Sequence, residues 1–170
     1  MALVVQKFGG SSLADAHAIR NVASRIAHAQ DADNQIVAVV SAMGDTTDDL
    51  FSMARQVSES PDPREMDMLL STGELVSCAL LAMALRSLGR NAISLSGAQA
   101  GIRTNTSHGK ARIAFLEPHR IMDELAEGRI VIVAGFQGIT DDMDVTTLGR
   151  GASDLSAVAI AAELKADRCE

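Results

Sequence analysis

The chain has 170 residues, of which 47% are hydrophobic and 2% aromatic, and it carries a formal net charge of -7 at pH 7. This length suits one domain with a sizeable core, and an aliphatic core favours helices on a sheet of β-branched residues over an all-β sandwich. The negative charge argues against a broad contact with a nucleic-acid backbone, and the shortage of aromatic residues argues against a stacking platform for single strands. No nucleic-acid partner is therefore expected.

Cysteine and targeting signals narrow the class of protein further. Cys78 and Cys169 do not form a C-x-x-C pair, so neither a zinc site nor a dithiol site is expected, and Cys78 is predicted to be a buried thiol. The start of the chain lacks the charged and apolar segments of a signal peptide. The longest apolar runs, CALLAMAL and IVIVAGF, are too short to cross a bilayer. These observations predict a cytoplasmic protein with no membrane partner.

Hydrophobic periodicity predicts alternating strands and helices in the first part of the chain. The predicted elements are a strand over 3–8, a helix over 14–29, a strand over 36–40, a helix over 46–57 and an exposed loop over 58–65. The first helix carries one apolar stripe, made of Ile19, Val22, Ala23, Ile26 and Ala27. Ser12 or Asp15 is expected to cap its start.

The strongest helical signal covers residues 65–88, where apolar residues recur at spacings of three and four and Gly89 follows as a C-terminal glycine should. Its predicted buried stripe consists of Met66, Leu69, Leu70, Gly73, Val76, Leu80, Leu81, Ala84, Leu85 and Leu88. The elements expected after it are a strand over 91–95, a loop or hairpin over 97–116, a helix over 118–127, a strand over 130–134, a glycine-rich loop over 135–151, a helix over 154–164 and the approach to a further strand over 166–170.

This order of elements predicts an α/β fold. Continuous apolar strands separated by helices indicate a three-layer α-β-α sandwich with a mainly parallel sheet. In such sheets ligands bind beyond the carboxyl ends of the strands. The loops over 7–12, 41–47 and 135–151 leave those ends, so we expect them to converge on one site.

Lys7 with Gly9 and Gly10 is a candidate anion site. Glycines let backbone N–H groups approach an anion, a following helix directs its positive end there, and a lysine neutralises phosphate. The alternative is an ordinary strand-to-helix turn with a solvated lysine. The chain contains neither a Walker A loop nor a G-x-G-x-x-G motif, so a P-loop and a Rossmann dinucleotide site are both unsupported.

Three further segments carry polar groups at strand or helix ends. Residues 41–50 read SAMGDTTDDL, and their hydroxyls and amides either hold polar substrate groups or cap the next helix through Asp45 or Thr46. Glu74 interrupts the apolar stripe of the strongest helix, and a buried carboxylate there needs a ligand ammonium or a structural arginine as partner. Arg150 has the shape to grip a carboxylate.

Other polar residues are expected to play simpler roles. Ser153 and Asp154 lie at a helix start, and the alternative to a functional role is that one of them is simply the N-cap. The four histidines lack metal-ligand spacing and are predicted to lie on the surface; they are His17, His28, His108 and His119. The acidic run over 141–144 is expected to form a solvated turn. No protein-built metal site is expected.

Five motifs occur in a fixed order along the chain: KFGGSS, VVSAMGDTTDDL, MLLSTGE, AGFQGIT and TTLGRGASD. Together they resemble the catalytic domain of the aspartate kinases, in the amino acid kinase family, over essentially all 170 residues. The resemblance implies transfer of a phosphoryl group from MgATP to the side-chain carboxylate of L-aspartate. It implies that Lys7 and Asp154 are catalytic, with Asp154 orienting lysine around the transferring phosphoryl group.

The resemblance also implies binding roles. The residues implied to bind ATP are Lys7, Gly9, Gly10, Ser11 and Ser41. The residues implied to bind aspartate are Ser41, Asp45, Thr46, Thr47, Glu74, Arg150, Gly151, Ser153 and Asp154. Among these, Arg150 would hold a carboxylate and Glu74 would lie near the amino group. A homo-oligomer is expected for the complete protein.

The chain departs from the family pattern at four positions and at its end. Ser11 stands where a threonine is common, and the hydroxyl is kept. Ala152 stands where a glycine is common and can require a positive φ, while Leu155 and Ser156 replace two threonines. The family continues beyond this point with a nucleotide-binding loop, a second phosphate-binding lysine and ACT regulatory domains. Residues 1–170 are therefore expected to be the N-terminal portion of a catalytic domain, weak or inactive alone. The alternatives are a non-catalytic module that keeps an aspartate site, and another carboxylate kinase of the same family.

Overall fold

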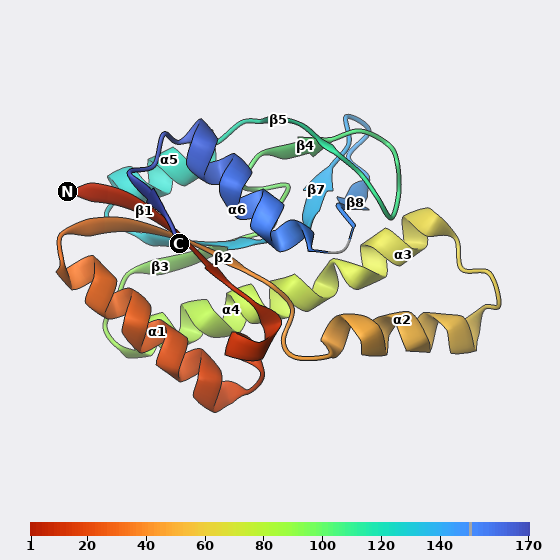
Figure 1. The fold of residues 1–170 in the computed structure, drawn as a ribbon, viewed down its shortest axis with the longest axis horizontal. Helices are drawn as coiled ribbons and strands as arrows, with labels where there is room; N and C mark the ends of the chain where they lie inside the picture. Colours follow the sequence, from red (N-terminus) through yellow and green to blue (C-terminus); the bar gives the residue numbers. More distant parts are fainter. Residues whose placement is uncertain (150) are drawn as a thin grey trace.

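The computed structural model describes residues 1–149 and 151–170, and it shows the predicted α/β architecture (Figure 1). A five-stranded sheet has the order β3-β6-β2-β1-β9, and every neighbouring pair of its strands is parallel. Its strands are β1 (Ala2–Phe8), β2 (Asn34–Val40), β3 (Ala92–Leu95), β6 (Ile130–Ala134) and β9 (Arg168–Cys169). The predicted strands at 3–8, 36–40, 91–95 and 130–134 are thus confirmed, and 166–170 does contain a further strand.

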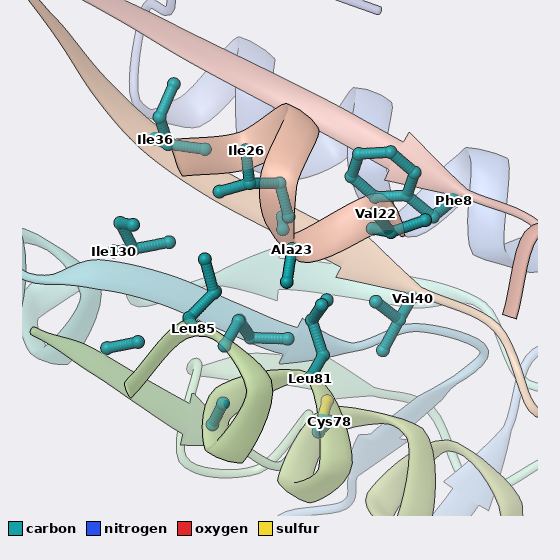
Figure 2. Packing of buried hydrophobic residues seen from close by; sticks show 14 of the residues in the cluster. Phe8, Val22, Ala23, Ile26, Ile36, Val40, Cys78, Leu81, Leu85 and Ile130 are labelled. Atoms are coloured by element: carbon teal, nitrogen blue, oxygen red, sulfur yellow. The ribbon is translucent and has the colours of Figure 1, made fainter. Parts of the chain in front are cut away.

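Helices cover both faces of this sheet. The helices on one face are α1 (Ala16–Asp31) and α4 (Thr72–Ser87), and those on the other are α5 (His119–Ala126) and α6 (Ala152–Glu163). Because side chains alternate along a strand, Ala38 of β2 faces α1 and α4 whereas Val37 and Val39 face α5 and α6. Figure 2 shows the first of these two aliphatic cores, where Leu81 and Leu85 of α4 meet the predicted stripe of α1. The three-layer prediction is confirmed.

A second, smaller sheet lies at one end of the first. Its strands have the order β5-β4-β7-β8 and are β4 (Ile102–Thr104), β5 (Ile113–Leu116), β7 (Gln137–Ile139) and β8 (Val145–Thr147). The expected hairpin within 97–116 is confirmed by the antiparallel pair β4 and β5. The prediction that 135–151 is only a loop is wrong, because β7 and β8 pair within it. Some buried positions of this second sheet are polar: the hydroxyls of Thr104 on β4 and Thr146 on β8 share a 2.6 Å hydrogen bond. The hydrophobic pattern of the sequence therefore gave no signal for strands over 135–151.

Local capping residues define several helix starts. Asp15 caps α1 by accepting a 2.8 Å hydrogen bond from the backbone N–H of Ala18, which decides between the two expected caps, and a short 3-10 helix, η1 (Gly10–Leu13), precedes it. Helix α2 has the predicted bounds, Thr46–Val57. The exposed loop after α2 ends at Asp62, whose carboxylate caps α3 (Pro63–Leu70) by accepting from the N–H of Arg64.

The helix predicted over 65–88 is two helices, α3 and α4, which are separated at Ser71. The carbonyl of Ser71 accepts a 2.8 Å hydrogen bond from the Gln137 side chain, and the hydroxyls of Ser71 and Thr72 bond back to the carbonyls of Met68 and Leu69. These bonds compete with the regular helical ladder at the STG sequence, so the helix is interrupted there.

The predicted stripe of this helix is wrong in part. The side chains of Val76, Leu80 and Leu88 are exposed, while Cys78 is buried as predicted. Burial and the neighbouring Glu74 raise the pKa of the Cys78 thiol. Among the described residues, the segment Pro63–Ser87, which contains α3 and α4, is long and apolar enough by composition to cross a membrane. Half of its most apolar stretch is buried within the fold, however, and core helices of globular proteins meet the same criterion.

Candidate active site

A cavity of about 290 Å³ lies at the carboxyl ends of β1, β2 and β6. The loops that follow these three strands converge there, as predicted from the topology. Its lining consists of Lys7, Gly10, Ser41, Ala42, Gly44, Thr47, Asp48, Glu74, Phe136, Gly151, Ala152, Ser153 and Asp154.

The cavity brings together most of the predicted site residues that the structure describes. Those that line it are Lys7, Gly10, Ser41, Thr47, Glu74, Gly151, Ser153 and Asp154. Those that do not line it are Gly9, Ser11, Asp45 and Thr46. Arg150 falls outside the described residues, so its predicted role stays a prediction.

The surroundings of Gly10 explain why the turn after β1 has glycine at this position. Its backbone carbonyl accepts a 3.0 Å hydrogen bond from the N–H of Gly44, which joins this turn to the loop after β2. A Cβ atom at Gly10 would lie 2.8 Å from the carbonyl oxygen of Ala42, too close for any larger residue without a backbone shift. The close approach of the two loops therefore requires glycine at this position.

Lys7 and Asp154 form an ion pair at the mouth of the cavity. The Lys7 ammonium, at the end of β1, lies 2.8 Å from Asp154 Oδ1 in the first turn of α6. The N-cap of α6 is Gly151, with a φ of 77°, so the alternative of Ser153 or Asp154 as the N-cap is wrong. The positive end of α6 faces the same cavity as the lysine, which makes this region attractive to an anion.

The departures from the family pattern fit this geometry. Ala152 is the first residue of α6 and does not adopt a positive φ, so its methyl group is not strained and packs against Ala111 and Leu148. Ser156 is fully buried, and its hydroxyl accepts a hydrogen bond from the N–H of Phe136 and donates one to the carbonyl of Ala152. Leu155 is about half exposed, at 49%.

Glu74 brings an incompletely paired carboxylate into the cavity. It lies in the first turn of α4 with 3% of its surface exposed, and Oε1 accepts a 3.2 Å hydrogen bond from the N–H of Ala42. Within the described part of the chain, Oε2 has no hydrogen-bond partner and no cation pairs with Glu74. Burial raises the pKa of Glu74 to about 7. Such a group is suited to receive a positively charged ligand group.

A fully buried carboxylate beside the site was missed by the sequence analysis. Asp67 on α3 accepts hydrogen bonds from the Thr147 hydroxyl at 2.5 Å and the Gly109 N–H at 3.0 Å, and it lies 2.7 Å from His108 Nδ1. His108 is therefore half-buried and not the surface residue that was predicted. The missed signal is spacing, because Asp67 precedes Glu74 by two helical turns and interrupts the same apolar stripe.

The acidic run at 141–144 is also more ordered than predicted. Asp144 pairs with Arg64 of α3, its Oδ1 accepting from Nε at 3.0 Å and from Nη2 at 2.8 Å. Asp141 and Asp142 are exposed, as expected of a solvated turn. The pair adds a second link between α3 and the β7–β8 hairpin.

Comparison with known proteins supports one family. The model of the amino acid kinase family matches residues 2–170. The chain belongs to the amino acid kinase family. It is 62% identical to an aspartokinase of Mycolicibacterium smegmatis and 54% identical to aspartokinase 2 of Bacillus subtilis, over its full length in both cases. It spans only 41% and 42% of the lengths of these relatives.

Solved structures of the same family resemble the chain closely. An aspartate kinase from Synechocystis is 48% identical with a TM-score of 0.85, and the match covers 99% of this chain and 27% of that one. E. coli aspartokinase III in complex with aspartate and ADP is 27% identical with a TM-score of 0.87, covering 98% of this chain and 48% of the other. The amino acid kinase fold of the chain is thereby established.

Proposed function

We propose that the chain is the aspartate- and phosphate-binding portion of an aspartate kinase. The observation that carries the proposal is the meeting, in one cavity, of the Lys7–Asp154 ion pair with the buried carboxylate of Glu74. One group is suited to an anionic phosphate, and the other to the ammonium group of an amino acid. The names of the relatives support the same substrate pair, because one neighbour was solved with aspartate and ADP.

The reaction forms 4-phospho-L-aspartate and ADP. A side-chain carboxylate oxygen of aspartate attacks the γ-phosphorus of ATP, the bond to the bridging oxygen breaks, and ADP leaves with that electron pair. The nucleophile is already ionised, so the site needs no general base. Phosphoryl transfer requires positioning and charge neutralisation, which Lys7 supplies at the phosphates while Asp154 holds its ammonium in place.

Substrate binding divides between two sides of the cavity. On the phosphate side, the N–H groups of the turn formed by Gly9, Gly10 and Ser11, together with Ser41, hold ATP. On the other side, Glu74 receives the ammonium group of aspartate. The remaining polar contacts to aspartate come from Thr47, Gly151 and Ser153, which line the cavity, and from Arg150.

The site fits a magnesium ion that arrives with the nucleotide. Among the described residues, no three histidine, cysteine or acidic side chains are grouped to hold a metal. Mg²⁺ commonly keeps waters and phosphate oxygens and takes only one or two carboxylates, and Asp154, whose Oδ1 is paired with Lys7, would be a candidate ligand through its other oxygen. When bound with ATP, the ion would neutralise charge on the phosphates.

Wider assignments belong to the same proposal. The reaction would be the first committed step towards lysine, threonine, methionine and diaminopimelate, in the cytoplasm. Residues 1–170 would form the N-terminal portion of the catalytic domain, and the complete protein would be a homo-oligomer. An N-acylated substrate, as for an acetylglutamate kinase, fits less well because it has no ammonium group to pair with Glu74.

Calorimetry with the 170-residue chain tests the proposal. L-aspartate should bind, N-acetyl-L-aspartate should bind at least about tenfold more weakly, and Glu74→Gln should remove that preference. Glu59→Gln, at an exposed glutamate outside the cavity, is the matched control and should leave the aspartate affinity and the ligand preference unchanged. Equal affinity for both ligands would contradict the assignment of Glu74. A coupled assay for ADP then distinguishes a catalytic portion of the enzyme, which forms ADP, from a non-catalytic module that only binds aspartate.

A further inference from the structure

A second cavity adjoins the substrate cavity and has a different character. It measures about 440 Å³, and the two cavities share Thr47, Asp48 and Phe136. Much of its lining comes from helices α2 and α3, the pair that extends past the end of the main sheet in Figure 1. Its lining is mostly apolar, from Phe51, Pro61, Pro63, Met66 and Leu70, and charged residues also line it: Asp48, Asp67 and Arg55, whose guanidinium lies over the Phe51 ring. The substrate cavity presents the charged groups of Lys7, Glu74 and Asp154.

Phe136 occupies the boundary with an unusual backbone conformation. Its φ is 67°, in the left-handed region that glycine adopts freely and that bulky residues rarely adopt. Two hydrogen bonds hold the backbone there: its N–H donates to the Ser156 hydroxyl at 3.1 Å, and its carbonyl accepts from the N–H of Leu148 at 2.9 Å. Glycine would satisfy both bonds without strain, so the side chain, and not the turn, accounts for phenylalanine at this position.

Packing alone is an incomplete explanation of that side chain. Phe136 contacts a small cluster made of Ala111, Leu148 and Ala152, but it is only partly buried. Phe136 also lines both cavities.

We propose that Phe136 is a specificity-determining residue, the wall that ends the substrate cavity on the side of the apolar cavity. The inference rests on the proposed function, because it concerns the same site. With the wall present, the site accepts an amino dicarboxylate without bulky substituents. With the wall removed, the two cavities become continuous, and an amino dicarboxylate that carries an apolar group on carbon 3 fits with its polar end beside Glu74 and its apolar group beside Phe51.

The experiment compares two ligands on the 170-residue chain by calorimetry. The ligands are L-aspartate and L-threo-3-benzyloxyaspartate, and the variants are Phe136→Gly and Phe136→Ala. Phe115→Ala is the matched control, because Phe115 on β5 is 51% exposed and lines neither cavity. Both variants remove the phenyl ring, but glycine suits the left-handed backbone and alanine does not, so the two variants should differ in stability. Thermal melts verify that each variant is folded.

The expected result is a change of ligand preference. Both Phe136 variants should bind the benzyl ether at least about tenfold more tightly than wild type does, because its ring becomes buried, while Phe115→Ala should behave as wild type. Phe51→Ala added to Phe136→Gly should reverse much of this gain. If wild type binds the benzyl ether as well as the folded variants do, or if neither folded variant gains affinity while aspartate still binds, Phe136 is not the wall. Aspartate that binds neither wild type nor Phe115→Ala contradicts the proposed function itself, and the inference about Phe136 with it.

Discussion

The burial of Glu74 makes the stability of the chain depend on pH in a direction that can be worked out. Its side chain is 3% exposed, and burial raises its pKa from 4.5 to about 7. Between these two values the folded chain keeps a proton that the unfolded chain has released. The free energy of unfolding therefore falls as the pH rises from 4.5 through 7. Because one pKa unit is worth about 1.4 kcal/mol, the total loss is about 3 kcal/mol.

Replacing Glu74 with glutamine should remove this dependence. Urea unfolding without ligand, between pH 5 and pH 8, measures it, and far-ultraviolet circular dichroism is the suitable probe because the chain has no tryptophan or tyrosine. Over this range wild type should lose about 2.5 kcal/mol more than Glu74→Gln. The comparison uses the change with pH, because the cost of burying the new amide is the same at every pH.

A second buried glutamate provides the control. Glu124 is also 3% exposed, but its hydrogen bonds and charge interactions with Arg129 and Arg120 lower its pKa. It is ionised in both the folded and the unfolded chain across this range, so Glu124→Gln should change stability equally at pH 5 and pH 8. Parallel pH profiles for wild type and Glu74→Gln would refute the reasoning, since they would mean that Glu74 is ionised within the fold.

Three other predictions follow from the site. Binding of aspartate at pH 6 should release close to one proton, seen by calorimetry in buffers of different ionisation enthalpy, and Glu74→Gln should abolish the release; an unchanged release would contradict the ammonium subsite. Gly10→Ala should lower the free energy of unfolding by about 1–3 kcal/mol, because its methyl would lie 2.8 Å from the carbonyl of Ala42, whereas Ser11→Ala should have little effect. Asp67→Asn should cost about 2–4 kcal/mol in urea unfolding, because an amide nitrogen cannot accept the bonds that the carboxylate receives, and unchanged stability would show that this network is dispensable.

The main sheet was predictable because its signals are local. Strand β6 is a run of five apolar residues between polar or glycine neighbours, and its predicted and observed bounds agree. Helix α2 also has its predicted bounds. Parallel topology then places the carboxyl ends of the strands at one edge, so the convergence of Lys7, Ser41 and Gly151 on one cavity followed without any knowledge of side-chain geometry.

The errors come from interactions between distant parts of the chain. The interruption at Ser71 depends on a hydrogen bond from Gln137, 66 positions away, which no periodicity reveals. Strands β7 and β8 pair through a partly polar hairpin, so their composition resembles that of a loop. The left-handed backbone of Phe136 is equally hidden, because a phenylalanine between strands gives no sign of a positive φ.

The two halves of the candidate site are joined through Ala42. Its carbonyl lies against the position of Gly10, and a Cβ atom at Gly73 would come within 2.9 Å of its methyl group. Its N–H donates a 3.2 Å hydrogen bond to the carboxylate of Glu74. A shift of the turn that follows Lys7 must therefore move the loop around Ala42, and with it the environment of Glu74. Binding at the proposed phosphate turn and binding at the proposed ammonium subsite are for this reason expected to be energetically coupled.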